Sequence, residues 1–206
     1  MKRFFLLVSG FFALQNNASA QLSISPEAGY QMSKVRYEIA GKEDNGDFKS
    51  GLRFGANLGL GVSDHLILQG GAFFSGKGGD INMLGFDVSR TFNYIDIPVV
   101  LNYMTGVATG SRFFIGAGPY WSYAIGGNNK ALGTKTDVEI GSNAATDDIR
   151  PMDFGINANI GFLLSGGFYV RGMYAHGLTN ILPGGDSDNS MRNSSLSLSL
   201  GYNFTF

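Results

Sequence analysis

Few side chains in this sequence have a type and spacing that could support catalysis. The chain contains two histidines and no cysteine, so thiol chemistry and disulfides are excluded. His176 is the strongest candidate, because we expect Ser190 or Ser194 of a following strand to lie near it, as in a His–Ser hydrolase. No carboxylate stands at a spacing that would orient the imidazole. We therefore predict that the protein is not an enzyme and has no catalytic residue.

Two further segments resemble ligand-binding motifs. Residues 71–77 read Gly-Ala-Phe-Phe-Ser-Gly-Lys, like the front of a phosphate-binding loop, but the Ser or Thr that should follow is missing. Residues 186–190 place oxygen ligands at alternate positions, but the glycine and closing glutamate of a calcium loop are absent. We predict no cofactor and no metal site.

A third group consists of charged and amide side chains that share one parity along predicted strands. In residues 51–62 that parity reads Arg53, Gly55, Asn57, Gly59, with apolar residues between them. Alternate residues of a strand point to opposite faces, so these side chains should meet inside a closed sheet. The predicted lumen network consists of Arg53, Asn57, Gln69, Asp96, Asn102, Asp153, Asn157 and Arg171. We expect Arg53 and Arg171 to pair with Asp96 and Asp153, as a structural plug or, alternatively, as an ion path.

Eight segments show the alternation that positions these residues. They are residues 22–32, 51–62, 65–76, 91–104, 111–124, 153–164, 168–178 and 191–206. Their connections alternate between long loops (33–50, 77–90, 125–152 and 179–190) and short turns (63–64, 105–110 and 165–167). This pattern predicts an all-β fold: an eight-stranded antiparallel up-and-down transmembrane β-barrel.

The direction of the apolar face separates a membrane barrel from a soluble one. Only 15% of residues are charged, and we assign the charges within strands, including Arg112, to the face opposite the apolar one. A soluble barrel would instead carry many Lys and Glu outside. The apolar face should therefore meet lipid. The mature chain has 13 Lys and Arg against 16 Asp and Glu, a net charge of −3, so we expect no nucleic-acid partner.

The two ends of the chain carry targeting features. Residues 1–20 combine a basic start, an apolar run and an Ala-Ser-Ala site, so we predict a cleaved signal peptide and a mature barrel domain of residues 21–206. Tyr202, Phe204 and Phe206 alternate at the C-terminus, an ending that resembles the last strand of outer-membrane barrels. We predict that they form the signal read by the barrel-assembly machinery.

Four segments resemble the PorT-like outer-membrane β-barrel proteins. They are Tyr-Ile-Asp-Ile-Pro-Val-Val-Leu-Asn-Tyr at 94–103, Phe-Ile-Gly-Ala-Gly-Pro-Tyr at 114–120, Gly-Leu-Thr-Asn-Ile at 177–181 and the final Gly-Tyr-Asn-Phe. Asp96 stands where that family more often has Glu. The resemblance implies a small outer-membrane barrel, and one named member takes part in type IX protein secretion.

Together these features predict a non-catalytic integral protein of the cell outer membrane. We expect it to present surface loops in a structural, interaction or envelope-secretion support role. Its expected partners are outer-membrane lipid and lipopolysaccharide, the assembly machinery, and an unidentified envelope or secretion-system protein. A membrane-embedded lipid A-modifying hydrolase and a narrow channel remain the alternatives.

Overall fold

The computed structural model describes residues 21–39, 41–83, 86–106, 110–131 and 133–206. The predicted signal peptide at 1–20 lies outside the described residues. Eight long strands form the body of the molecule. They are β1 (Leu22–Ile39), β3 (Lys49–Gly61), β4 (Leu66–Met83), β5 (Phe86–Met104), β6 (Arg112–Ala131), β8 (Met152–Leu163), β9 (Phe168–Gly177) and β10 (Asn189–Tyr202).

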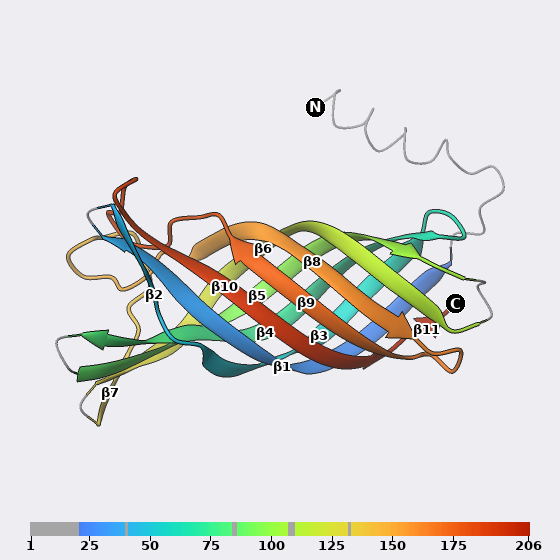
Figure 1. Cartoon of the computed structure of the whole chain (residues 1–206), viewed down its shortest axis with the longest axis horizontal. Coiled ribbons are helices and arrows are strands. Elements are labelled where there is room, and N and C mark those ends of the chain that lie inside the picture. Colours follow the sequence, from blue (N-terminus) through green and yellow to red (C-terminus); the bar gives the residue numbers. More distant parts are fainter. Residues whose placement is uncertain (1–20, 40, 84–85, 107–109, 132) are drawn as a thin grey trace.

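These strands form a closed antiparallel ring in chain order. Neighbouring strands pair from β1 through β3, β4, β5, β6, β8, β9 and β10. The ring closes because β10 also pairs with β1, from Glu27 opposite Gly201 to Ile39 opposite Asn189. Figure 1 shows the strands crossing the long axis obliquely, as expected for a barrel. The predicted eight-stranded antiparallel barrel is confirmed.

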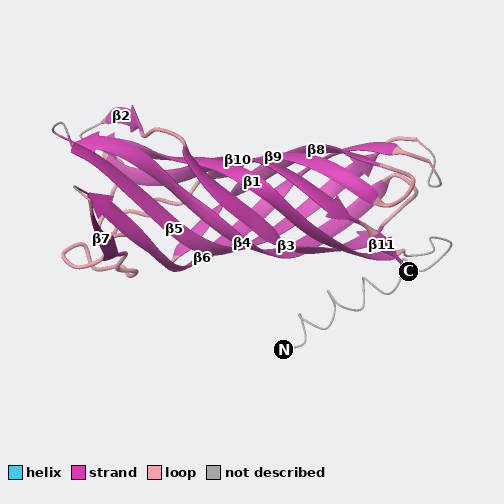
Figure 2. Cartoon of the chain, turned by 90° about the horizontal axis from the view of Figure 1, so that it is seen from below, coloured by secondary structure: helices cyan, strands magenta, loops and turns pink. Residues whose placement is uncertain are grey.

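Three short strands extend the ring at its two ends. β2 (Lys42–Asn45) pairs with the end of β1, and β7 (Thr134–Asp137) pairs with the end of β6. β11 (Phe204–Thr205) pairs with the start of β1. Figure 2 shows β2 and β7 projecting from one end of the barrel, while β11 and the C-terminus lie at the other.

The apolar parity points outward, as predicted from the alternation. Leu58, Ile160 and Leu198 are 58%, 61% and 63% exposed, whereas the intervening Asn57, Asn159 and Ser199 are buried. A wide apolar surface with a polar interior is the reverse of a soluble barrel. Among the residues that the structure describes, no helix is long and apolar enough to cross a membrane.

The short-turn end agrees with the sequence prediction, but the long-loop end differs. Much of the predicted loops 33–50, 77–90 and 125–152 is strand, since β4 and β5 continue as a hairpin to Met83 and Phe86 and β6 continues to Ala131. In these extensions the outward apolar alternation is interrupted, since Gly, Asn and Lys are frequent in β4 and β6 and the apolar residues of β1 move to the inward parity at Val35. We call the end with the connections 62–65, 105–111 and 164–167 the turn end, and the opposite end the loop end.

Candidate functional site

The centre of the lumen is organised around one carboxylate, Glu27 of β1. Arg53 donates to Glu27 Oε1 at 2.8 Å, and Arg171 Nη1 lies 3.1 Å from Oε2. The Tyr169 hydroxyl donates to Oε2 at 2.8 Å, and the Asn57 amide donates to it at 3.3 Å. All five side chains are buried. The two arginines are therefore bound to a shared carboxylate that also accepts two neutral hydrogen bonds.

Glycines opposite Glu27 make this arrangement possible. Glu27 stands opposite Gly55 of β3 and Gly201 of β10, which have no side chains to fill the space beside it. A Cβ at Gly201 would collide with the Tyr169 ring, so only glycine lets that hydroxyl reach Glu27. The Arg53 guanidinium also lies 3.5 Å from the centre of the Phe73 ring, a cation–π contact that further fixes the side chain.

A second ion pair lies further toward the loop end. Lys77 Nζ is 2.9 Å from Asp96 Oδ1 and donates to the Ser122 hydroxyl at 3.0 Å. Asp153 is buried nearby and accepts a hydrogen bond of 3.0 Å from the Asn193 amide. The predicted pairing of Arg53 and Arg171 with Asp96 and Asp153 is therefore wrong. Both arginines pair with Glu27, and Asp96 pairs with Lys77.

The remaining residues of the predicted network also point inward. Gln69 Oε1 accepts from Asn102 at 2.8 Å and from Arg171 at 2.9 Å, which joins these residues to the Glu27 cluster. Asn157 instead donates to the Pro119 carbonyl at 3.4 Å. The structure thus brings most of the predicted residues into two connected groups, and leaves Asn157 outside them. That they serve as a structural plug stays a prediction.

Arg112 lies at the turn end rather than in these groups. It is buried, and its Nε donates to the Thr105 carbonyl at 3.1 Å. It therefore closes the β5–β6 connection and takes no part in the central network.

Apolar clusters close both ends of the polar lumen. At the loop end, Val138, Ile149 and Ile181 fold in from the loops and pack with Phe92 and Met191. At the turn end, Met104, Phe114 and Tyr169 form a smaller cluster. Two cavities within the lumen have volumes of about 30 and 10 Å³. A single water needs roughly 10–15 Å³ by this measure, so the larger cavity holds at most two or three waters and the smaller at most one.

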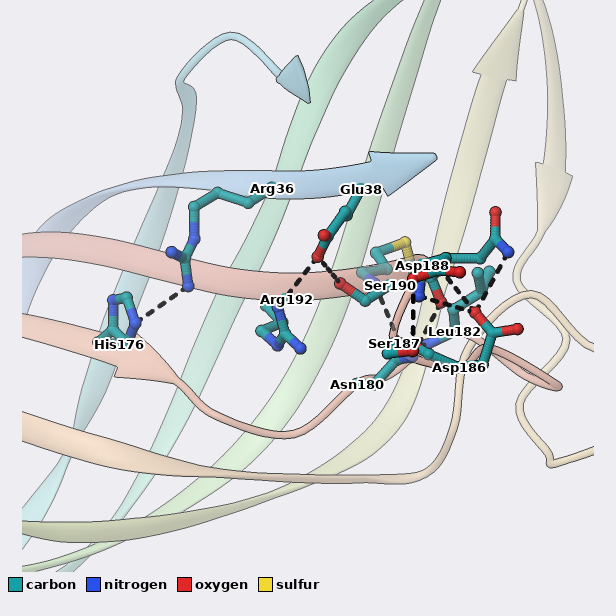
Figure 3. Close-up of polar contacts among 12 residues, drawn as sticks. Arg36, Glu38, His176, Asn180, Leu182, Asp186, Ser187, Asp188, Ser190 and Arg192 are labelled. Atoms are coloured by element: carbon teal, nitrogen blue, oxygen red, sulfur yellow. Dashed lines mark hydrogen bonds and ion pairs between the residues drawn. The ribbon is translucent and has the colours of Figure 1, made fainter. Parts of the chain in front are cut away.

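His176 lies outside the barrel near the loop end, with different neighbours from those of a catalytic histidine (Figure 3). Arg36 Nη2 is 3.1 Å from His176 Nε2, and the Tyr174 hydroxyl is 3.3 Å from Nδ1. Arginine can only donate, so Nε2 accepts and the imidazole proton sits on Nδ1, which donates to Tyr174. Ser194 is opposite His176 in the sheet, whereas Ser190 donates to Glu38 at 3.3 Å.

The surroundings of His176 differ from the sequence prediction in one respect. Lys34 and Arg36 of β1 and Arg192 of β10 take the outward parity of the neighbouring Met32 and Leu196. The expectation that charges within strands all face the lumen is therefore wrong at the loop end. The reason is that these strands continue beyond their apolar stretch, where outward charges no longer face hydrocarbon.

In the structure, the side chains of the motif-like segments 71–77 and 186–190 are engaged in contacts within the chain. Residues 71–77 lie within β4, and Lys77 is committed to Asp96. Asp186 accepts hydrogen bonds from the backbone amides of Asn189 and Asp188, at 2.8 and 3.0 Å, which hold the pKa of its carboxyl below the ordinary value. Within the described residues, no group of three or more His, Cys, Asp or Glu could hold a metal ion.

The predicted assembly residues lie at the turn end. Tyr202 ends β10, Phe204 lies in β11, and their rings are 4.6 Å apart. Phe206 is exposed, and its backbone amide donates to the Leu22 carbonyl at 2.9 Å. Recognition of these residues during assembly stays a prediction.

Glu27 and Lys77 are the functional residues that the sequence prediction missed. Glu27 shares the parity of Ser25 and Gln31 within the first predicted strand, so its inward direction was readable from the alternation. Lys77 falls in the predicted loop 77–90, one residue beyond the predicted strand 65–76. The outward cations Lys34 and Arg36 fall likewise in the predicted loop 33–50.

Comparison with known proteins agrees with the fold. Residues 13–183 match a family model described as "Outer membrane protein beta-barrel domain". OprG from Pseudomonas aeruginosa is similar in structure, with a TM-score of 0.51 and 12% identity over 90% of this chain and 96% of OprG. Ail, the attachment invasion locus protein of Yersinia pestis, gives a TM-score of 0.46 and 14% identity over 91% of this chain and 100% of Ail. A search of curated protein sequences finds no match.

At these identities the structural similarity speaks for the fold alone, whereas the family model spans most of the sequence. The chain therefore belongs to the outer membrane protein beta-barrel domain family, and its location is the outer membrane.

Proposed function

We propose that this protein is a non-catalytic outer-membrane barrel that conducts no solutes and works through the surface at its loop end. The observation that carries the proposal is the filled lumen. Ion pairs centred on Glu27 and Asp96 cross-link the middle, and apolar clusters cover both ends. Eight strands leave an interior that side chains can just fill, and the two lumen cavities named above hold only a few waters.

The state of His176 argues against the hydrolase alternative. A general base needs a free lone pair within reach of the proton that it removes. In His176 that lone pair accepts a hydrogen bond from Arg36, and the proton on Nδ1 faces the Tyr174 hydroxyl rather than a carboxylate. A serine–histidine hydrolase uses the same tautomer with other partners: a carboxylate holds the Nδ1 proton, and the Nε2 lone pair faces the serine hydroxyl rather than an arginine.

The loop end carries the longer connections between strands. The β4–β5 hairpin and the β6–β7 extension project from the barrel there, and loops 138–151 and 178–188 are anchored by Ile149 and Ile181. Binding residues are often found on loops that a rigid scaffold holds in place. With the PorT-like motifs at 94–103 and 114–120, this surface favours a structural or secretion-support role beside another envelope protein.

Planar-bilayer recording of the purified, refolded protein tests the sealed lumen. We expect no reproducible conductance steps from the wild type. The variant Ile149→Ser/Ile181→Ser, which opens the apolar cluster at the loop end, should leak more often, and Leu52→Ala on the outer face serves as the control. Regular steps from the wild type that disappear when the lumen is blocked would overturn the proposal in favour of a channel.

A second measurement addresses the hydrolase. Wild-type protein and the His176→Gln variant are incubated with purified lipid A in detergent, and released fatty acid is measured by mass spectrometry. We expect no release above a protein-free control from either sample. Release by the wild type that the variant lacks would show that the barrel is an enzyme.

A further inference from the structure

The outward face of β1, β9 and β10 changes from apolar to basic within two residues. Met32 pairs with Leu196, and both are exposed apolar side chains. The next outward row holds Lys34, Ser194 and His176, and the row after it holds Arg36 opposite Arg192. Two residues of a strand span about 7 Å, so the cations begin where an apolar band would meet lipid head groups. We call Lys34, Arg36, His176, Arg192 and Ser194 the rim patch.

Positive charge in the rim patch is poorly neutralised. Arg192 lies 3.8 Å from Glu38, and Lys34 contacts the Phe48 ring at 5.4 Å. Within the described part of the chain, neither Lys34 nor Arg36 lies within ion-pairing distance of a carboxylate. Arg36 instead stands directly opposite Arg192. Like charges in directly opposed strand positions repel each other, so an anion bound between or above the two arginines would stabilise them.

Two buried polar atoms of the rim patch also lack a partner. Among the described residues, Arg36 Nε and the Ser194 hydroxyl oxygen have no hydrogen-bond partner. Both groups carry a proton to donate, and the surrounding cations are donors as well. The ligand that completes such a site is an acceptor with negative charge and several oxygens. Arginine binds phosphate through paired N–H groups, and a small rotation of Arg36 away from His176 would turn its Nε–H edge outward.

We propose that the rim patch binds the phosphate group of an anionic glycolipid in the outer leaflet. Lys34, Arg36 and Arg192 supply the charge, Ser194 supplies a neutral donor, and the neighbouring Met32 and Leu196 contact the acyl chains. His176 holds Arg36 in place while the site is empty and loses that contact when phosphate binds. The site faces lipid rather than the loop tips, so it goes beyond the proposed function and does not depend on it.

The two histidines allow binding at this site to be observed directly. His176 belongs to the rim patch, whereas His65 lies at the turn end and stacks on Tyr103, so it is an internal control. Protein labelled with ¹⁵N-histidine is refolded into zwitterionic detergent micelles and titrated with monophosphoryl lipid A. We expect the imidazole signals of His176 to shift to saturation, and those of His65 to stay constant.

Three arms of the titration identify what is bound. The dephosphorylated form of the same lipid should leave His176 unchanged, and an equal shift would overturn the role of the phosphate. Inorganic phosphate should bind far more weakly than the lipid, and equal affinity would show a free-phosphate site and overturn the lipid assignment. A shift of both histidines in parallel would show general insertion of lipid into the micelle and overturn the site.

Variants test the residues. Arg36→Gln/Arg192→Gln should weaken lipid binding by about tenfold or more, where tenfold corresponds to about 1.4 kcal/mol. Lys130→Gln/Lys135→Gln removes equal charge from the β6–β7 hairpin and should leave binding unchanged. Heat-modified gel mobility checks that each variant folds. Arg36→Lys keeps the charge but loses the paired N–H donors, so it tests the donor geometry separately from the charge. Wild-type affinity in both Arg36→Gln/Arg192→Gln and Arg36→Lys would overturn the proposal.

Discussion

Charged residues at the centre of the lumen and at the rim patch differ in how they are neutralised. In the lumen, Glu27 lies 2.8 Å from Arg53 and 3.1 Å from Arg171 and is almost completely enclosed. At the rim, Arg36 faces Arg192, and the nearest ion pair, between Arg192 and Glu38, is 3.8 Å long and partly exposed. In the lumen both arginines are ion-paired with a carboxylate of the chain, which indicates a structural role. At the rim, no ion pair joins Arg36 to a carboxylate among the described residues, which indicates a ligand.

The largest expected effect comes from removing the lumen carboxylate. Glu27→Gln keeps the shape of the side chain but leaves Arg53 and Arg171 buried without a counter-charge. Breaking a buried ion pair in this way costs about 3–5 kcal/mol. Urea unfolding of the barrel in lipid vesicles, followed by tryptophan fluorescence, should show that loss of unfolding free energy.

Glu38→Gln is the matched control, because it changes a carboxylate of the same strand that pairs at the partly exposed rim. Exposed ion pairs contribute about 0.2–1 kcal/mol, so its effect should be small. If the two variants lost equal stability, the distinction between a completed lumen cluster and an open rim would fail.

The next largest effect concerns the outer surface between the two regions. Leu198 is 63% exposed on the face that we assign to lipid. Leu198→Arg should therefore cost about 2–4 kcal/mol in vesicles if the side chain lies near the midplane. The measurement is the same urea titration.

Ser199→Asn supplies the comparison on the other face. Ser199 is buried in the lumen opposite Gly29 and Arg171, where an added amide finds polar neighbours. We expect it to cost less than Leu198→Arg. A benign Leu198→Arg together with a severe Ser199→Asn would contradict the assignment of the two faces.

The barrel itself could be predicted because a membrane barrel imposes a simple pattern on each strand. Residues 52–60 alternate between Leu, Phe or Ala outside and Arg, Gly or Asn inside, and the structure follows that alternation. The extensions of β1, β4, β5 and β6 could not be predicted in the same way. In β1 the apolar positions move from the outward parity of Met32 to the inward parity of Val35, which is buried in the loop-end cluster. The ends of β4 and β6 are rich in Gly, Asn and Lys, so the alternation that reveals a strand is interrupted in these extensions.

The candidate sites were predictable only in part, for a related reason. Parity alone shows that Arg53 and Arg171 point inward, but the choice of Glu27 as their partner depends on the pairing register of β1 with β3 and β10. The rim patch needs the same information, because Arg36 and Arg192 are 156 positions apart and meet only where the barrel closes. Register across the closure is set by all the strands together, and no local motif encodes it.

The smallest expected effect tests the rim patch without any ligand. Arg192→Gln removes the repulsion between Arg192 and Arg36, and it also removes the 3.8 Å contact between Arg192 and Glu38. The loss of repulsion and the loss of attraction should nearly cancel. In detergent free of phosphate and anionic lipid, we expect the unfolding free energy to change by no more than about 0.5 kcal/mol. Arg171→Gln, which takes a buried arginine from Glu27, should cost clearly more.

Adding monophosphoryl lipid A gives a second comparison between the Arg192→Gln and Arg171→Gln variants, now in the stability gained on binding. A ligand that binds only the folded barrel stabilises it in proportion to its affinity, so the wild type should gain stability as the lipid is added. Arg171→Gln should gain as much as the wild type, since its rim patch is intact, whereas Arg192→Gln should gain little. A large loss from Arg192→Gln without lipid would mean that the pair is part of the fold, and would remove the argument that an anion is missing from the rim.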